Sequence, residues 1–287
     1  RTALYLGVLL VMAGVSLLVK ENLDRIGPFG IAAGLTLAAA ATLVWVVRRG
    51  PAFSWGEQSS AHLAFDYILL LGVLLVGADL AYIEWKFTPL GSDWSWHVLF
   101  MALFSGAMAF RYDSRVLWSL GLSSFAAWRG VAVSLGSATH ALTGEVAPIA
   151  RWNALACGAF FVILGWLLKS GDRKAHFEPV ATYMGWLLTL GALIAGSLAG
   201  AFSNDPARIG WGLALLLVGG GLAFWTARQR RFWLFALAAI AGYIGLSSLL
   251  LHAIGDQFGC FWFWSTSTGM LILLLMMYLR WGKGADA

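Results

Sequence analysis

The sequence predicts an all-α, polytopic integral membrane protein, a bundle of about ten transmembrane helices with parallel internal repeats. Of its 287 residues, 60% are hydrophobic and 11% are charged, whereas soluble domains average about 25% charged residues. Such a chain cannot wrap its apolar residues in a polar shell, so the bilayer is the solvent that it requires. The apolar residues also form continuous runs of membrane-helix length, and most charged residues lie between these runs.

Ten apolar segments account for residues 1–287 as a single transmembrane domain. The runs do not alternate between apolar and polar residues, which favours helices over a β-barrel. Lys20, and not a small-residue cleavage site, follows the first run, so no cleavable signal peptide is expected. Arg129 interrupts the fifth segment. The expected helices lie near residues 2–19, 27–47, 65–84, 96–111, 116–137, 149–168, 178–202, 208–226, 232–251 and 259–279.

The distribution of Lys and Arg orients these helices. Thirteen of the nineteen basic residues fall on the side of the N-terminus, five fall on the opposite side, and Arg129 is left within the membrane. The positive-inside rule therefore predicts that both termini are cytoplasmic, in a protein of the bacterial inner membrane. Because the basic residues form small groups between apolar runs and no basic face, we expect no nucleic-acid partner.

Internal similarity indicates parallel repeats. Residues 71–76 have the same letters as residues 6–11, and residues 106–110 resemble residues 220–224. Each copy of the repeat starts on an odd-numbered helix, so the copies point the same way through the membrane. Small residues also predict helix contacts: Gly30 and Gly34 are four apart and share a face. Gly72 and Asp79 occupy the positions of Gly7 and Gly14, which places an acid on a face built for close contact.

The opening hairpin resembles a family of prokaryotic predicted membrane proteins, known only as a domain of unknown function. The resemblance rests on residues 6–14, on Asn22 and Pro28, and on the pattern of residues 72–83 and 102–128. Family members commonly have Trp after the asparagine, where this chain has Leu23. The resemblance implies a multi-pass inner-membrane protein and supplies no reaction or ligand.

Asp79 and Arg129 are the strongest candidates for an intramembrane site. Each lies 14 residues from a predicted cytoplasmic helix end, Phe65 or Arg115, which is about 21 Å along a helix. A lone charge at this depth is costly and requires a partner or water. We predict that the two form a charge pair, which either braces two helices or serves a proton- or ion-coupled function.

The predicted outer loops hold a second group of polar residues. A metal site there is disfavoured, because no spacing places two His residues on one helical face. Solvated interface residues are the simpler interpretation. The candidates are Glu84, His140, Glu145, Arg151, His252 and Asp256.

Three function classes follow from these observations. We favour a non-catalytic accessory or structural subunit of a membrane assembly, with the lipid bilayer and other membrane subunits as partners. The alternative is a transporter or permease for a small or lipid-like solute, with its charged site at Asp79 and Arg129. An enzyme is not expected, because the chain has no phosphate-binding loop, HExxH or paired CxxC motif and no adjacent nucleophile and base. For the same reasons we expect no cofactor and no metal.

Overall fold

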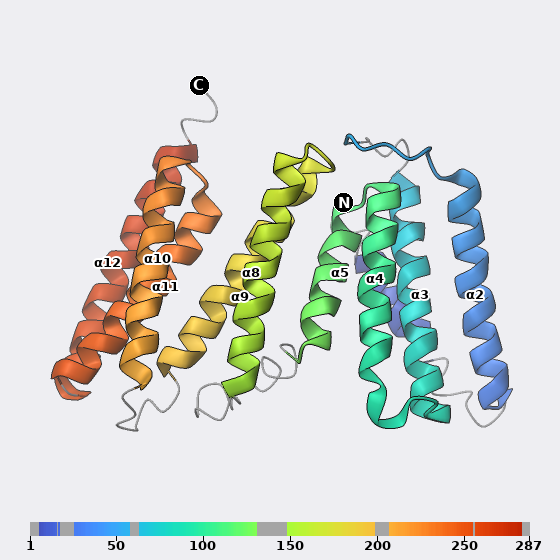
Figure 1. The fold of residues 1–287 in the computed structure, drawn as a ribbon, viewed down its shortest axis with the longest axis horizontal. Helices are drawn as coiled ribbons and strands as arrows, with labels where there is room; N and C mark the ends of the chain where they lie inside the picture. The colour runs from blue at the N-terminus through green and yellow to red at the C-terminus, as the bar shows by residue number, and fades with distance from the viewer. Residues whose placement is uncertain are drawn as a thin grey trace. The chain divides into compact units, whose positions relative to one another are not determined.

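The protein is all-α (Figure 1). A computed structural model describes residues 6–15, 17, 26–57, 63–130, 148–198, 207–254 and 256–282, and no strand occurs among them. A helix at Leu6–Val15 comes first. It is followed by α2 (Pro28–Arg49), α3 (Leu63–Phe87), α4 (Ser95–Tyr112), α5 (Arg115–Trp128), α8 (Pro148–Ser170), α9 (Glu178–Leu198), α10 (Ala207–Arg228), α11 (Phe232–Ile254) and α12 (Asp256–Gly282).

The helices coincide with the ten predicted segments, and six of them are long and apolar enough to cross a membrane. The fifth is shorter than predicted. It ends at Trp128 and not near residue 137, with Arg129 and Gly130 in a turn. Gly130 has a φ of 79°, the left-handed conformation in which glycine commonly ends a helix. Arg129 therefore follows a helix and does not interrupt one.

The chain divides into two compact units. The first comprises residues 1–128 and 164–181, and the second comprises residues 129–163 and 182–287. In the first unit α2 packs against α3 and α4 against α5, and in the second α10 and α12 both pack against α11. The turn between α8 and α9 thus packs with the first unit, although most of both helices belongs to the second.

Glycines bring helices together in both units. A Cβ atom placed on Gly121 of α5 would lie 3.0 Å from the backbone nitrogen of Gly106 on α4. A Cβ on Gly219 of α10 would lie 2.6 Å from the nitrogen of Gly242 on α11. Lipid tails offer helices no hydrophobic gain for associating, so such close backbone approach is a main source of their packing energy. Gly34 makes no close helix contact with the described residues, since a Cβ there meets none of them within 4 Å.

Three helix hairpins share one turn geometry. In each, a residue with positive φ follows the first helix, and the next backbone N–H donates to a carbonyl five residues earlier, the Schellman arrangement. The positive-φ residues are Asp113 (62°), Asp172 (49°) and Arg230 (56°). The bonds run from Ser114 to Ala109 (3.2 Å), Arg173 to Leu168 (3.3 Å) and Arg231 to Thr226 (3.2 Å). Shared turns are compatible with the internal repeat, which stays a prediction.

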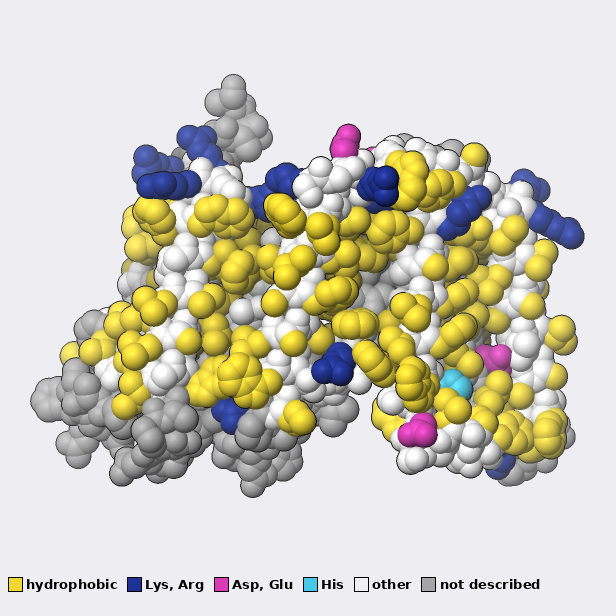
Figure 2. All heavy atoms as spheres, viewed as in Figure 1, with side chains coloured by type: hydrophobic (Ala, Val, Ile, Leu, Met, Phe, Trp, Pro, Cys, Tyr) yellow, Lys and Arg dark blue, Asp and Glu magenta, His cyan; other side chains and the backbone are white. Residues whose placement is uncertain are grey.

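Apolar side chains cover the helices of the first unit along their length (Figure 2). Many of them are exposed, among them Phe29, Leu37 and Val47 of α2. Arg48 and Arg49 lie in the last turn of α2, at the end of the unit where Lys and Arg gather in Figure 2. An apolar band bounded by basic residues is the surface that a bilayer requires.

We expect Gly219→Ala to destabilise the α10–α11 hairpin by about 1–3 kcal/mol, because the added methyl group overlaps the backbone of Gly242. Gly220→Ala is the matched control, since a Cβ there meets nothing within 4 Å and alanine favours the helix by about 0.5–1 kcal/mol. Unfolding in mixed micelles, followed by circular dichroism, measures both variants. Equal effects would contradict the packing described here.

Candidate functional site

A cavity of about 630 Å³ lies within the first unit. The helix Leu6–Val15 contributes Met12, and the remaining lining comes from α3, α4, α5 and the loop between α3 and α4. Most of the lining is apolar. The lining residues are Met12, Leu74, Gly77, Ala78, Leu80, Ala81, Glu84, Trp85, Trp94, His97, Val98, Met101, Leu120 and Ser124.

Glu84 and His97 form the polar part of this lining. His97 Nε2 lies 2.9 Å from Glu84 Oε2. The backbone N–H of Gly91 donates to Glu84 Oε1 at 2.9 Å, and that of Leu90 donates to Oε2 at 3.3 Å. Glu84 therefore holds the loop between α3 and α4 as well as lining the cavity. Its side chain and that of His97 are 15% and 20% exposed, so the pair is largely shielded from the surroundings.

Asp79 lies in the contact between α2 and α3 and does not line the cavity. It is 9% exposed, and its Oδ2 lies 2.8 Å from Thr36 Oγ1 of α2. Gly72 faces α2 as well, because a Cβ there would lie 3.2 Å from Thr42 Oγ1. The acid and the glycine thus share one contact face, as their spacing predicted.

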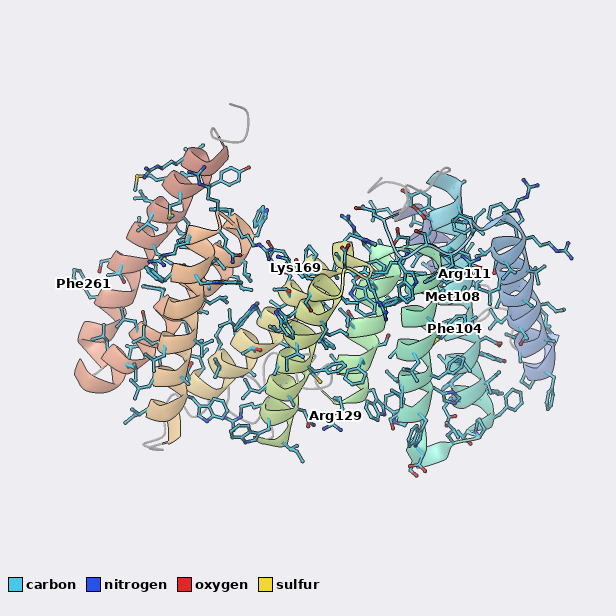
Figure 3. All side chains as sticks on the ribbon, turned by 45° about the horizontal axis from the view of Figure 1, so that its top comes forward. Phe104, Met108, Arg111, Arg129, Lys169 and Phe261 are labelled. Atoms are coloured by element: carbon cyan, nitrogen blue, oxygen red, sulfur yellow. The ribbon has the colours of Figure 1, made fainter. Side chains whose placement is uncertain are left out.

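Arg129 contacts Asn153 of α8. Its Nη2 donates to Asn153 Oδ1 at 3.0 Å, and Asn153 Nδ2 donates to the Arg129 carbonyl at 2.9 Å. Figure 3 shows Arg129 just past the end of α5. Asp79 belongs to the first unit and Arg129 to the second, and the proposed charge pair stays a prediction.

Of the other polar residues predicted on the outer side, the structure describes the side chain of Arg151. The Arg151 guanidinium lies 5.6 Å from the centre of the Trp211 ring, a cation–π distance. His140 and Glu145 lie outside the described residues, as do the side chains of His252 and Asp256. Among the side chains that the structure describes, no three His, Cys, Asp or Glu residues come together as a metal site would require.

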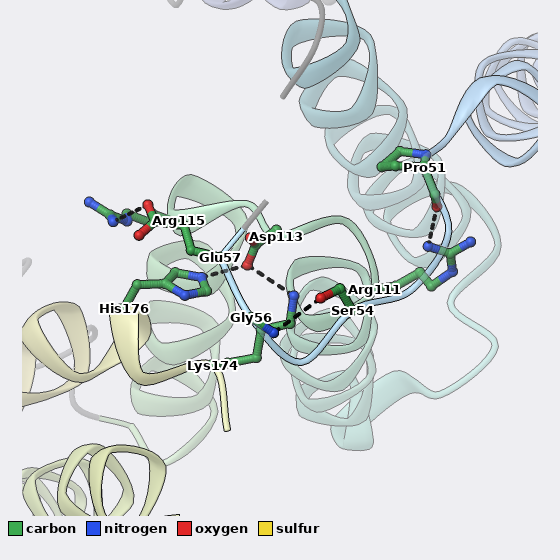
Figure 4. Close-up of polar contacts among 9 residues, drawn as sticks. All are labelled: Pro51, Ser54, Gly56, Glu57, Arg111, Asp113, Arg115, Lys174 and His176. Carbon is green, nitrogen blue, oxygen red and sulfur yellow. Dashed lines mark hydrogen bonds and ion pairs between the residues drawn. The ribbon is translucent and has the colours of Figure 1, made fainter. Parts of the chain in front are cut away.

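A buried ionic cluster, which we call the clasp, joins two turns of the first unit (Figure 4). Lys174 Nζ lies 3.0 Å from Asp113 Oδ1, with side chains 1% and 3% exposed. His176 Nε2 lies 2.5 Å from the same oxygen. The Lys174 backbone N–H donates to the Trp55 carbonyl at 3.0 Å. The clasp therefore ties the loop after α2 and the α8–α9 turn to the α4–α5 turn.

Exposed polar contacts and buried aromatic rings surround the clasp. Arg115 Nη2 lies 2.6 Å from Glu57 Oε1, with both side chains more than half exposed. The Phe177 ring is fully buried and stacks on Trp118, with ring centres 5.4 Å apart. Phe110 also packs against Phe177, at 5.5 Å. These rings exclude water from beneath the ionic contacts, so the clasp is a structural tie at the end of the helices.

The sequence alone did not single out His97, Thr36 or the clasp residues. His97 is 13 residues from Glu84 in the chain, and Asp113 is 61 residues from Lys174. One sequence signal could have pointed to the clasp. Asp113 follows the basic end of an apolar segment, as Asp172 does, and Asp adopts the left-handed conformation of a helix end more readily than most residues.

Residues 1–118 match the model of a family described as a predicted membrane protein, DUF2157. This confirms the resemblance to an uncharacterised membrane family. The matched stretch includes Asp79 and most of the cavity lining. No curated protein and no solved structure matches the chain.

We expect Lys174→Met to lower the stability of the first unit by about 3–5 kcal/mol, because it leaves the buried Asp113 carboxylate without its lysine. Glu57→Gln is the matched control, since it breaks an exposed ion pair with Arg115 worth about 1 kcal/mol or less. Thermal unfolding in detergent compares the two variants. Similar losses in both would show that the clasp contributes no more than a surface pair.

Proposed function

We propose that the protein is a non-catalytic membrane protein that binds a lipid-like amphiphile in its α3–α4–α5 cavity. The supporting observation is the cavity itself, whose volume of about 630 Å³ lies within the range of about 300–1,000 Å³ typical of small-molecule pockets. An apolar lining suits a hydrocarbon chain. Glu84 and His97 supply donors and acceptors for a polar head group, and Trp85 and Trp94 lie beside them.

This proposal favours the transporter or permease class over the accessory subunit. It differs from the alternative drawn from the sequence in one respect: the ligand contacts Glu84 and His97, and not Asp79 and Arg129. The subunit role stays a prediction, because the exposed apolar residues that would contact a partner are also the residues that lipid covers. Residence in the bacterial inner membrane and cytoplasmic termini likewise stay predictions.

Filling the cavity tests the proposal. We expect Ala78→Phe to lower binding of a photoactivatable diazirine fatty acid by about tenfold, or 1.4 kcal/mol, because the new ring occupies space beside Leu74 and Met101. Mass spectrometry of the cross-linked protein measures adduct yield and position, and in the wild type the adducts should map to α3, α4 and α5.

Ala40→Phe is the matched control, because it adds the same ring to an exposed position of α2. Its adduct yield should equal that of the wild type. Adducts spread evenly over all apolar helices, with no effect of Ala78→Phe, would show that the fatty acid only partitions into the surrounding lipid.

A further inference from the structure

The Thr36 hydroxyl lies within hydrogen-bond distance of two oxygen atoms. Thr36 Oγ1 lies 2.8 Å from Asp79 Oδ2 and 2.9 Å from the carbonyl oxygen of Ala32. A hydroxyl group has one hydrogen to donate. The Ala32 carbonyl can only accept, and donation to the carbonyl four residues earlier is the usual bond of Thr in a membrane helix. When Thr36 donates to Ala32, the hydrogen of the Thr36–Asp79 contact has to come from the carboxyl group; an ionised Asp79 would instead compete with Ala32 for the one hydrogen of Thr36.

The second carboxyl oxygen gives independent support. Asp79 Oδ1 is buried and has no hydrogen-bond partner among the described residues. An ionised carboxylate accepts hydrogen bonds at both oxygens, and a buried charge with so few donors is costly within a bilayer. In the neutral acid one oxygen donates and the other is an ordinary carbonyl, so the cost of burial is much smaller.

Among the described residues, no Lys, Arg or His forms an ion pair with Asp79. The only charged residues of α2 are Arg48 and Arg49, which lie at least 12 residues from Thr36, or about 18 Å along the helix. The helix Leu6–Val15 has no charged residue. Tyr82 of α3 donates its hydroxyl hydrogen to the Pro28 carbonyl at 3.4 Å.

The remaining titratable groups of the neighbouring helices are engaged elsewhere or lie far along the chain. Glu84 of α3 is held by His97 of α4. Arg111 of α4 donates to the Pro51 carbonyl at 2.7 Å. Asp66 and Lys86 lie near opposite ends of α3, 13 and 7 residues from Asp79.

We propose that Asp79 is a proton-binding site within the membrane, where its carboxyl group keeps a proton and donates a hydrogen bond to Thr36 across the α2–α3 contact. The hydrogen bonds run in one direction, from Asp79 to Thr36 and from Thr36 to Ala32. The ligand is the proton alone, and the site stands apart from the cavity. A neutral Asp79 forms no charge pair, so this proposal replaces the Asp79–Arg129 pair that was predicted from the sequence.

Infrared spectroscopy of the full chain in lipid nanodiscs at neutral pH tests this assignment. A protonated carboxyl group has a C=O stretching band that a carboxylate lacks. The wild-type spectrum minus that of Asp79→Asn should contain this band, equivalent to one carboxyl group per chain and shifted in D₂O. Glu84→Gln is the control and should leave the band unchanged, because Glu84 accepts two backbone hydrogen bonds as a carboxylate does.

A second variant keeps the test decisive if Asp79→Asn does not fold. Thr36→Val retains the acid and removes its acceptor, so the C=O band should persist and change frequency. Absence of the band from the wild type, with a loss of carboxylate bands in Asp79→Asn, would overturn the proposal. An unchanged spectrum in Thr36→Val would also overturn it, because the Asp79 carboxyl group would then not donate a hydrogen bond to Thr36.

Discussion

Every part of this fold answers to one constraint: the bilayer supplies neither water for hydrogen bonds nor a hydrophobic gain for bringing helices together. Helices must then associate through close packing, and their polar side chains must find partners within the chain. The glycine contacts meet the first requirement. At Gly158 and Gly185 the helices α8 and α9 approach so closely that a Cβ on either would lie 2.7 Å from the carbonyl oxygen of the other.

Many Ser and Thr side chains meet the second requirement within their own helix, as Ser123 and Thr226 do by bonding to a carbonyl four residues earlier. Others bond to a neighbouring helix. The Tyr243 hydroxyl of α11 lies 2.8 Å from Thr266 Oγ1 and 2.9 Å from Ser267 Oγ, both on α12. Ser248 of α11 donates to the Ser197 carbonyl of α9 at 3.3 Å. Asp79 differs from these residues because its Oδ1 is buried and has no hydrogen-bond partner among the residues that the structure describes. That contrast, more than the presence of an acid in an apolar helix, makes Asp79 the candidate for chemistry.

The helices could be predicted from the sequence, because length and continuous hydrophobicity are local properties. Their ends were less certain: the turn at Gly130 depends on a backbone conformation that an apolar run does not reveal. Contacts between helices were harder to predict than helix ends. The spacing of Gly30 and Gly34 is typical of a helix interface, yet a Cβ on Gly34 meets none of the described residues within 4 Å. By contrast, Gly121, the one glycine of α5, lies against α4. Which glycine is used depends on which helices are neighbours, and one sequence does not state this.

In the site, too, single residues could be identified from the sequence, whereas their partners in the fold could not. Glu84 could be identified because it lies with other polar residues at the predicted outer side, but its partner His97 could not, because the pairing depends on the loop that Glu84 itself holds. The clasp was missed for a further reason. Lys174 was counted among the cytoplasmic basic residues, which are ordinarily solvated, yet its side chain is almost fully buried.

The helix α3 keeps the two proposed sites apart. At 100° per residue, Gly72 and Asp79 fall on one face, whereas Leu74, Gly77 and Ala81 fall roughly opposite. The first face packs against α2, and the second lines the cavity. Because the two faces share no side chain, Ala78→Phe can fill the cavity and leave the Asp79–Thr36 contact in place. The proposed ligand site and the proposed proton site therefore use separate faces of one helix.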